Sequence, residues 1–395
     1  MNSDSSQTSA WADVLNDPDV REVGGENTNE GVDFARYWAM SLLLQFEERG
    51  LEDYALVFEY LQDVAYFDSS VSPTAATLYQ VKKKARGHWT RTALCKRSEA
   101  VDCDGADPSS HDADAAKKKP KAKKLAAQSP LGKLHLCVEK LTPVAPTHGV
   151  FVSNAPYDLK SANGSIVPQY ARHCVSDLCT DDATYISSKI KKELAKVTPP
   201  NLKTLHVEQS RINPETMRET LRGQLDKYLH SQYPTLPSVS GRLQESLLQA
   251  FSTCSGKKPP LKSIEEIVAQ KGFSRIQFSE LIESLASARA FSTALDEAVA
   301  SIKAEGWPSR KCDHINRVAL RLQVRFMRHP ETKDAMAWDT AIDAAKAHKG
   351  IDTYSQAIDA IKGTYKQHWS SGPMPDDLDV TAIALLALLH VDEEP

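Results

Sequence analysis

The chain has 395 residues, of which 41% are hydrophobic and 25% are charged, and its formal net charge at pH 7 is −4. The length predicts two folded units plus some unfolded chain, and the composition is globular rather than fibrous or disulfide-rich. Because the sequence has no run of about 18 apolar residues and no signal-peptide pattern, we expect a cytoplasmic protein without a membrane span, and the net acidity does not suggest a nucleic-acid binder.

The first folded segment has the pattern of one helix followed by three strands. Apolar residues recur at steps of three and four from Asp33 to Glu48, which predicts an amphipathic helix that ends before Gly50. Short runs rich in Val, Tyr and Phe then predict strands at 54–58, 63–67 and 77–81. Residues 1–21 are polar and acidic, and we expect a flexible tail there.

Residues 99–128 have a low-complexity composition. Six acids lie between Glu99 and Asp114, and six lysines follow between Lys117 and Lys124. Because almost no large apolar residue occurs here, the segment cannot bury enough surface to offset the entropy of ordering, and we predict a disordered insertion. The lysines form either a solvated loop or a sequence-independent grip on a nucleic-acid backbone, and the two interpretations are compatible.

Ordered structure is expected again from Ser129 onward. The apolar pattern from Leu131 to Leu141 predicts a helix, and strands are expected at 149–153 and 204–207. Beyond Pro214 the patterns are helical, with helices expected at 217–229, 243–251, 264–268, 276–285, 295–302, 314–327 and further on to 389. Two capping boxes mark helix starts, Ser263 with Glu266 and Ser274 with Gln277. We therefore expect an α/β domain at 22–225 and an all-α domain at 226–395.

Two segments of the helical domain have unusual patterns. Four arginines at steps of four, four and three form a basic stripe on the helix 314–327, namely Arg317, Arg321, Arg325 and Arg328. Aligned like charges destabilise a helix, so we expect acidic helices of this chain, DNA or a protein subunit to face the stripe. Residues 380–391 are apolar nearly all round, which predicts a helix buried in its own core or in a partner.

A candidate site for phosphodiester hydrolysis combines Asp63, Gln80 and Lys82. Residues i and i+2 of a strand face the same side, so Gln80 and Lys82 would face a cleft while the residues beside them face the core. Asp63 begins the preceding strand, 17 positions before Gln80, which is hairpin spacing. Carboxylate and amide oxygens can hold Mg²⁺, or Mn²⁺ in its place, and a lysine can stabilise developing negative charge. Glu59 is an additional candidate acid, and the same pattern also fits charged residues on a sheet edge.

Several short motifs around this site occur in a characteristic order. They are Gly24-Gly25, Glu30-Gly31-Val32-Asp33-Phe34, a helix with Tyr37 and Trp38, Phe58-Glu59, Asp63-Val64 and Tyr79-Gln80-Val81-Lys82-Lys83-Lys84. In these motifs residues 22–94 resemble the PD-(D/E)XK double-stranded DNA endonuclease domain of bacterial anti-phage systems, and the resemblance continues more loosely through 151–154 and 207–208. That domain occurs in CD-NTase (CBASS) systems, fused to ligand-sensing modules, and as the effector subunit of Lamassu systems. The short, strand-poor C-terminal half makes the Lamassu subunit the closer match.

The resemblance implies an α/β restriction-endonuclease-like domain followed by an all-α regulatory or interaction domain. It implies a Mg²⁺-dependent endodeoxyribonuclease in which Asp63 and Gln80 are metal ligands and Lys82 polarises the attacking water or stabilises the transition state. It also implies that Lys83, Lys84 and Arg86 lie along the DNA phosphates. The long insertion after Arg97 departs from a minimal nuclease domain.

The resemblance also implies partners. These are double-stranded DNA, together with the SMC-like ATPase and the accessory subunit of a defence complex. Since one such site cuts one strand at a time, we expect a homo-oligomer on activation. Two other interpretations remain open: a helical adaptor or partner-binding subunit with a degenerate nuclease fold, and a ribonuclease or nickase.

Overall fold

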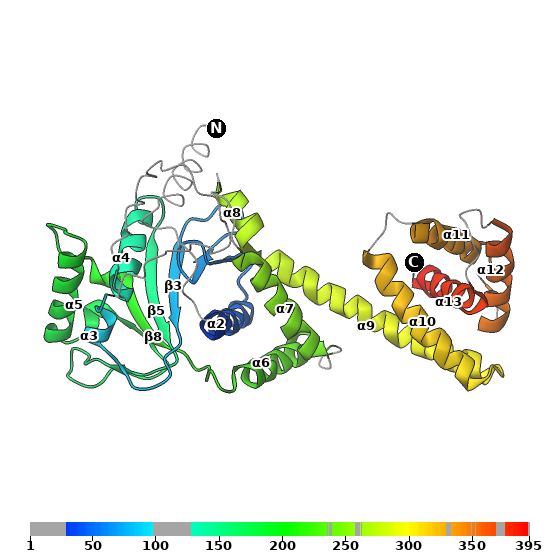
Figure 1. Cartoon of the computed structure of the whole chain (residues 1–395), viewed down its shortest axis with the longest axis horizontal. Helices are drawn as coiled ribbons and strands as arrows, with labels where there is room; N and C mark the ends of the chain where they lie inside the picture. Colours follow the sequence, from blue (N-terminus) through cyan, green and yellow to red (C-terminus); the bar gives the residue numbers. More distant parts are fainter. Residues whose placement is uncertain are drawn as a thin grey trace, which may run out of the picture. The chain divides into compact units, whose positions relative to one another are not determined.

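A computed structural model describes residues 29–97, 128–234, 236, 239–256, 261, 263–328, 333–348, 350–351, 353–368 and 376–393. The predicted tail lies outside the described residues, as does the predicted insertion except for its last residue. The chain forms two compact units, Met1–Ile282 and Glu283–Pro395. Figure 1 shows an α/β arrangement in the first and, among the described residues, only helices in the second, which confirms the expected order of fold classes.

The first unit is built on a seven-stranded mixed sheet. Its order is β7-β8-β5-β3-β2-β1-β9. The strands are β1 (Ala55–Phe58), β2 (Val64–Phe67), β3 (Ala76–Lys82), β5 (Thr147–Ser153), β7 (Arg172–Cys174), β8 (Leu205–Gln209) and β9 (Gly272–Ser274). β9, β1, β2 and β3 pair antiparallel, whereas β3, β5 and β8 are parallel, and β7 pairs antiparallel with β8. The carboxyl ends of the three parallel strands therefore lie at one edge of the sheet.

One face of the sheet is covered by helices of the first unit that contain aromatic anchors. Trp38 of α2 (Asn29–Glu48) packs on Tyr79 of β3, with ring centroids 4.8 Å apart, and Phe46 packs at 4.8 Å on Tyr66 of β2. α6 (Met217–Gln232) and α7 (Ser240–Ser255) pack beside α2 (Figure 1). Phe251 of α7 reaches β1, with its ring 4.5 Å from Phe58.

The opposite face is covered by α4 (Pro130–Leu141), α5 (Thr180–Glu193) and α8 (Ile264–Lys271). α4 begins as predicted, with the Ser129 side chain accepting a hydrogen bond from the Gly132 backbone. A side chain at Gly149 of β5 would approach Leu134 of α4 to 2.8 Å, so glycine permits this close packing. The resulting core contains Leu78, Phe151 and Val207, which share this face.

A small second sheet lies where the chain leaves the main sheet. β4 (Trp89–Thr90) pairs in parallel with β6 (Tyr157–Asp158). α3 (Arg91–Leu94) follows β4, and its Arg91 forms a 3.0 Å ion pair with Asp182 of α5. Two short 3₁₀ turns flank α5, Val175–Asp177 and Leu202–Thr204. These elements hold the loops after β3 and β5 against the sheet.

The second unit is a group of helices around an apolar one. It contains α10 (Ser309–Arg328), α11 (Lys333–Ala347), α12 (Tyr354–His368) and α13 (Asp377–Glu393), and α9 (Arg275–Ala304) crosses the boundary between the units. Residues 380–389 of α13 are all buried, against α10, α11 and α12. The apolar helix therefore lies in its own core, which settles the alternative left open by its pattern.

The arginine stripe has an acidic neighbour in the same unit. Arg321 of α10 lies 3.6 Å from the carboxylate of Asp379 on α13. Of the expected partners for the stripe, an acidic residue on a helix of the same chain therefore faces Arg321. The side chains of Arg325 and Arg328 fall outside the described part of α10.

Two further features differ from the expected elements, and one agrees with them. One helix, α9, replaces the two expected at 276–285 and 295–302, because the small residues between them continue the helix. The expected division at residue 225 falls inside the first unit, since α6 packs on α2 and β9 pairs with β1. The Ser274–Gln277 capping box is confirmed, with reciprocal hydrogen bonds of 2.8 and 3.3 Å. No described helix combines the length and apolarity that a membrane crossing needs.

Candidate functional site

Asp63 and Gln80 face each other across a hairpin. Val64 pairs with Tyr79 in the antiparallel β2–β3 ladder, so continuing this register by one residue places Asp63 opposite Gln80. The backbone N–H of Val81 donates a 2.7 Å hydrogen bond to Oδ2 of Asp63. The sheet therefore holds the carboxylate at the end of β3, where the spacing of the two residues predicted it.

Lys82, the last residue of β3, forms an ion pair with Asp63. Its Nζ lies 3.3 Å from Oδ2 of Asp63, and its side chain is 30% exposed whereas that of Asp63 is 5% exposed. Lys82 follows Gln80 by two residues in β3, so both lie on the face of the sheet that carries Leu78. A nearly buried carboxylate thus meets a cation that also reaches solvent.

Gln80 is buried, and its amide oxygen lacks a partner. Its exposed fraction is 5%, and Oε1 accepts no hydrogen bond within the described part of the chain. A buried acceptor without a donor costs free energy, about 1 to 3 kcal/mol. Native proteins retain such a cost where the group has a ligand to bind, so the Gln80 oxygen is a candidate ligand atom.

Glu59 lies in the turn between β1 and β2, on the opposite side of Asp63 from Gln80. Its backbone has a φ of 47°, which turns the chain toward Asp63, and its N–H donates to the Asp63 carbonyl at 3.2 Å. The ammonium of buried Lys271 is 3.4 Å from the Glu59 carbonyl. The structure therefore brings the backbone of Glu59 to the site.

The basic residues after β3 differ in their surroundings. Lys83 and Arg86 are exposed. The ammonium of Lys84 donates to the carbonyl of His88 and lies 4.5 Å from the centre of the Trp89 ring. Lys83 and Arg86 are thus at the surface beside the site, while Lys84 is held by its own loop.

The hairpin fits a divalent cation that keeps part of its water shell. No three His, Cys, Asp or Glu side chains form a metal cluster in the portion of the chain that the structure describes. Mg²⁺, however, typically takes one or two carboxylates and completes its shell with water and substrate phosphates. The Asp63 carboxylate and the unsatisfied Gln80 oxygen are oxygen donors of that kind.

Three further amide side chains near the strand ends were not among the predicted site residues. Gln62, beside Asp63, is 1% exposed, donates to Cys137 Sγ at 3.2 Å, and has an unpartnered Oε1 within the described residues. Asn154 follows β5, and Gln209 ends β8. Only the pairing of β3, β5 and β8 brings Asn154 and Gln209 to the edge that carries Lys82.

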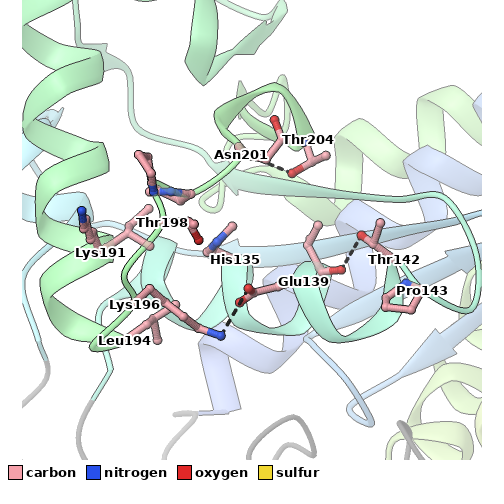
Figure 2. A pocket seen from close by; sticks show the side chains of 14 residues that line it. His135, Glu139, Thr142, Pro143, Lys191, Leu194, Lys196, Thr198, Asn201 and Thr204 are labelled. Atoms are coloured by element: carbon pink, nitrogen blue, oxygen red, sulfur yellow. Dashed lines mark hydrogen bonds and ion pairs between the residues drawn. The ribbon is translucent and has the colours of Figure 1, made fainter.

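A separate cavity of about 330 Å³ lies between α4, α5 and the chain after α5. Figure 2 shows His135, Glu139 and Lys196 around it, with Glu139 and Lys196 joined by a 3.2 Å ion pair. Burial lowers the pKa of His135. The lining residues include none of Asp63, Gln80 and Lys82, so this cavity is distinct from the strand-end site.

Comparison with known proteins identifies a family for the first unit. Residues 23–255 match the family model described as the Cap4 dsDNA endonuclease domain. That span contains the hairpin, the parallel strands and helices α2 to α7. No curated protein and no solved structure matches the chain.

Proposed function

Because the chain belongs to the family of the Cap4 dsDNA endonuclease domain, a group of DNA endonucleases of anti-phage defence, we propose that it cuts double-stranded DNA at the Asp63–Gln80–Lys82 hairpin. The observation that carries the proposal is the meeting of a buried carboxylate, an unsatisfied amide oxygen and a partly exposed lysine at one strand end. Two of these groups suit a cation, and the third suits a phosphate.

The proposed roles follow from these surroundings. Asp63 and Gln80 would hold Mg²⁺, or Mn²⁺ in its place. When bound, such an ion lowers the pKa of bound water and polarises phosphate oxygens. Lys82 can orient the attacking water or stabilise negative charge on the phosphate, because its ammonium lies at the mouth of the site. Lys83 and Arg86 would bind neighbouring phosphates, with Lys84 contributing from behind them.

The strand order supports a PD-(D/E)XK fold for this domain. A helix precedes an antiparallel meander of β1, β2 and β3, and α4 then leads to β5, which is parallel to β3. Asp63 stands before β2, and Gln80 and Lys82 stand two residues apart on β3. In the resembled family, the metal ligands and the lysine occupy these places, with an acid or an amide at the position of Gln80.

The second unit supports a role in a larger assembly. It has its own core and lies outside the family match, so the nuclease domain does not need it for its sheet. We propose that it binds the regulatory partners of a Lamassu-like complex, an SMC-like ATPase and an accessory subunit. Since a single site cuts one strand at a time, release from these partners would allow two nuclease domains to pair.

The test uses purified full-length protein, supercoiled plasmid and Mg²⁺ or Mn²⁺. We expect linear product from the wild type, a loss of at least about 100-fold in rate for Lys82→Ala, and a higher Mg²⁺ requirement for Asp63→Asn. Lys227→Ala, an exposed lysine of α6, is the matched control and should cut normally. Nicked product alone would indicate a nickase, and cleavage of RNA instead would indicate a ribonuclease.

Two outcomes would contradict the proposal. Full activity in Lys82→Ala would move the active site elsewhere. No cleavage by the wild type in either metal, even as an oligomer, would favour the adaptor with a degenerate fold, an alternative suggested by the uncharged Gln80.

A further inference from the structure

Asn154 lies beyond the end of β5, beside the segment that carries the candidate lysines. We propose that it is a positioning residue, whose carboxamide fixes the backbone of Lys84 and so orients residues 82–86 toward the DNA. The inference rests on the proposed function for the identity of that substrate. The positioning role itself follows from the contacts of Asn154.

The carboxamide of Asn154 makes two hydrogen bonds to one residue. Its Oδ1 accepts from the backbone N–H of Lys84 at 2.8 Å, and its Nδ2 donates to the carbonyl of Lys84 at 2.9 Å. Because one partner is a donor and the other an acceptor, only one orientation of the amide satisfies both. β3 itself ends at Lys82. The Asn154 side chain therefore pairs with both the N–H and the carbonyl of Lys84, as the backbone of a neighbouring strand does within the sheet.

Asn154 is itself held by the neighbouring strand. Its carbonyl accepts a 3.3 Å hydrogen bond from Nε2 of Gln209, and the backbone N–H of Ser210 donates to the Ser153 carbonyl at 2.8 Å. Ser153 pairs with both Lys82 and Gln209 in the parallel ladders. The end of β8 thus fixes the end of β5, and Asn154 transmits this constraint to the segment after β3.

The other end of that segment is tied down through Trp89. The indole N–H of Trp89 donates to Ser153 Oγ at 2.8 Å, and its ring packs 4.7 Å from that of Phe151. The Lys84 ammonium lies against the same ring. The intervening turn contains Gly87 at a φ of 79°, a left-handed conformation that favours glycine. Residues 83–88 therefore form a short loop fixed to β5 at both ends.

A fixed loop matters because Lys83 and Arg86 are long and exposed. Phosphate contacts set the register of a protein on duplex DNA, and a misplacement of about 1 Å near a reacting group can cost about 100-fold in rate. Without Asn154, Lys82 would keep its place in the β3 ladder while the loop after it lost one of its two ties. The loss would appear in DNA binding as well as in turnover.

The experiment compares Asn154→Ala and Asn154→Asp with Asn201→Ala in the full-length protein. Asn201 is the matched control, since its carboxamide also accepts from a backbone N–H, that of Lys203, but lies before β8. Three quantities are measured: hydrogen exchange of the peptide containing Lys84, the Kd for a DNA duplex without metal, and kcat and KM for plasmid cleavage. The aspartate variant keeps the size of the residue and removes one hydrogen bond, because its second oxygen would face the Lys84 carbonyl and two acceptors repel each other.

We expect both Asn154 variants to lose protection at Lys84, to bind duplex DNA about tenfold more weakly and to lose 10- to 100-fold in kcat/KM, while Asn201→Ala changes each less than about twofold. Unchanged protection would overturn the clamp. Lost protection with unchanged Kd and kcat/KM would make the clamp purely structural and overturn the positioning role. If the wild type cuts nothing, the proposed nuclease function fails, whereas weaker DNA binding by the variants would still support the positioning role and equal binding would overturn it.

Discussion

Replacing Gln80 by methionine should raise the stability of the protein and lower its cleavage activity. The Oε1 of Gln80 is buried without a hydrogen-bond donor among the described residues, which costs the folded protein about 1 to 3 kcal/mol. Methionine has a similar length and no polar atom, so Gln80→Met should remove that cost. We expect the free energy of unfolding to rise by about 1 kcal/mol, or Tm by roughly 2 to 4 °C for a unit of this size. Cleavage should fall at least tenfold, by analogy with losses around metal ligands.

Gln80→Glu should do the opposite in the absence of metal. It adds a second carboxylate opposite Asp63 in a buried position, so desolvation and like-charge repulsion should destabilise the metal-free protein. Bound Mg²⁺ would then restore stability, by about 2.7 kcal/mol when the ion is at 100 times its Kd. The wild type should respond less.

Urea denaturation with and without 10 mM Mg²⁺, at about physiological ionic strength, measures both effects, and plasmid cleavage by the same preparations measures activity. A Gln80→Met protein that is markedly less stable than the wild type, or that cuts DNA at the normal rate, would refute the assigned role of the Gln80 oxygen. A Gln80→Glu protein whose stability ignores Mg²⁺ would show that the ion binds elsewhere.

Two further predictions concern pH and domain limits. Burial lowers the pKa of His135, so the unfolded chain takes up a proton there more readily than the folded protein. The stability that the neutral, buried His135 contributes is therefore present above the unfolded pKa of about 6.5 and is lost as the pH falls below it. Urea midpoints at pH 7.5 and 5.5 should therefore differ less in His135→Gln than in the wild type, and an equal difference would exclude His135 as a source. Removal of residues 283–395 should leave a folded, DNA-cleaving first unit, whereas a cut before residue 240 removes α7, α8 and β9 and should abolish folding, as circular dichroism and size exclusion can measure. Loss of folding in the longer fragment would mean that the second unit stabilises the first.

Local patterns predicted the hairpin of the candidate site well. The spacing of Asp63 and Gln80, with strand alternation bringing in Lys82, was enough to anticipate their meeting, because a hairpin joins residues that are close in sequence. The cap formed by Ser274 and Gln277 was also predicted, as was the helix after Ser129, because both depend on residues that are close in sequence. The roles proposed for these residues remain predictions.

Long-range pairing explains what the sequence could not predict. Asn154 lies 70 residues from Lys84, and Gln209 lies 55 residues from Asn154. Neither was a candidate site residue, although Asn154 ends the segment 151–154 of the looser resemblance, and only the parallel β3–β5–β8 arrangement brings them together. The three-residue strands β7 and β9 were missed because such short segments carry no alternation, and their place depends on the strand they join.

The pairing of β9 with β1 has a consequence for synthesis on the ribosome. β1 is wholly buried between β2 and β9, yet β9 emerges about 200 residues later, and it lies beyond the family match at residue 255. At typical elongation rates a nascent chain therefore carries an open, apolar strand edge for roughly 10 to 40 s. Such an edge is a template for association with other nascent chains, so we expect the nascent protein to be prone to aggregation during this interval.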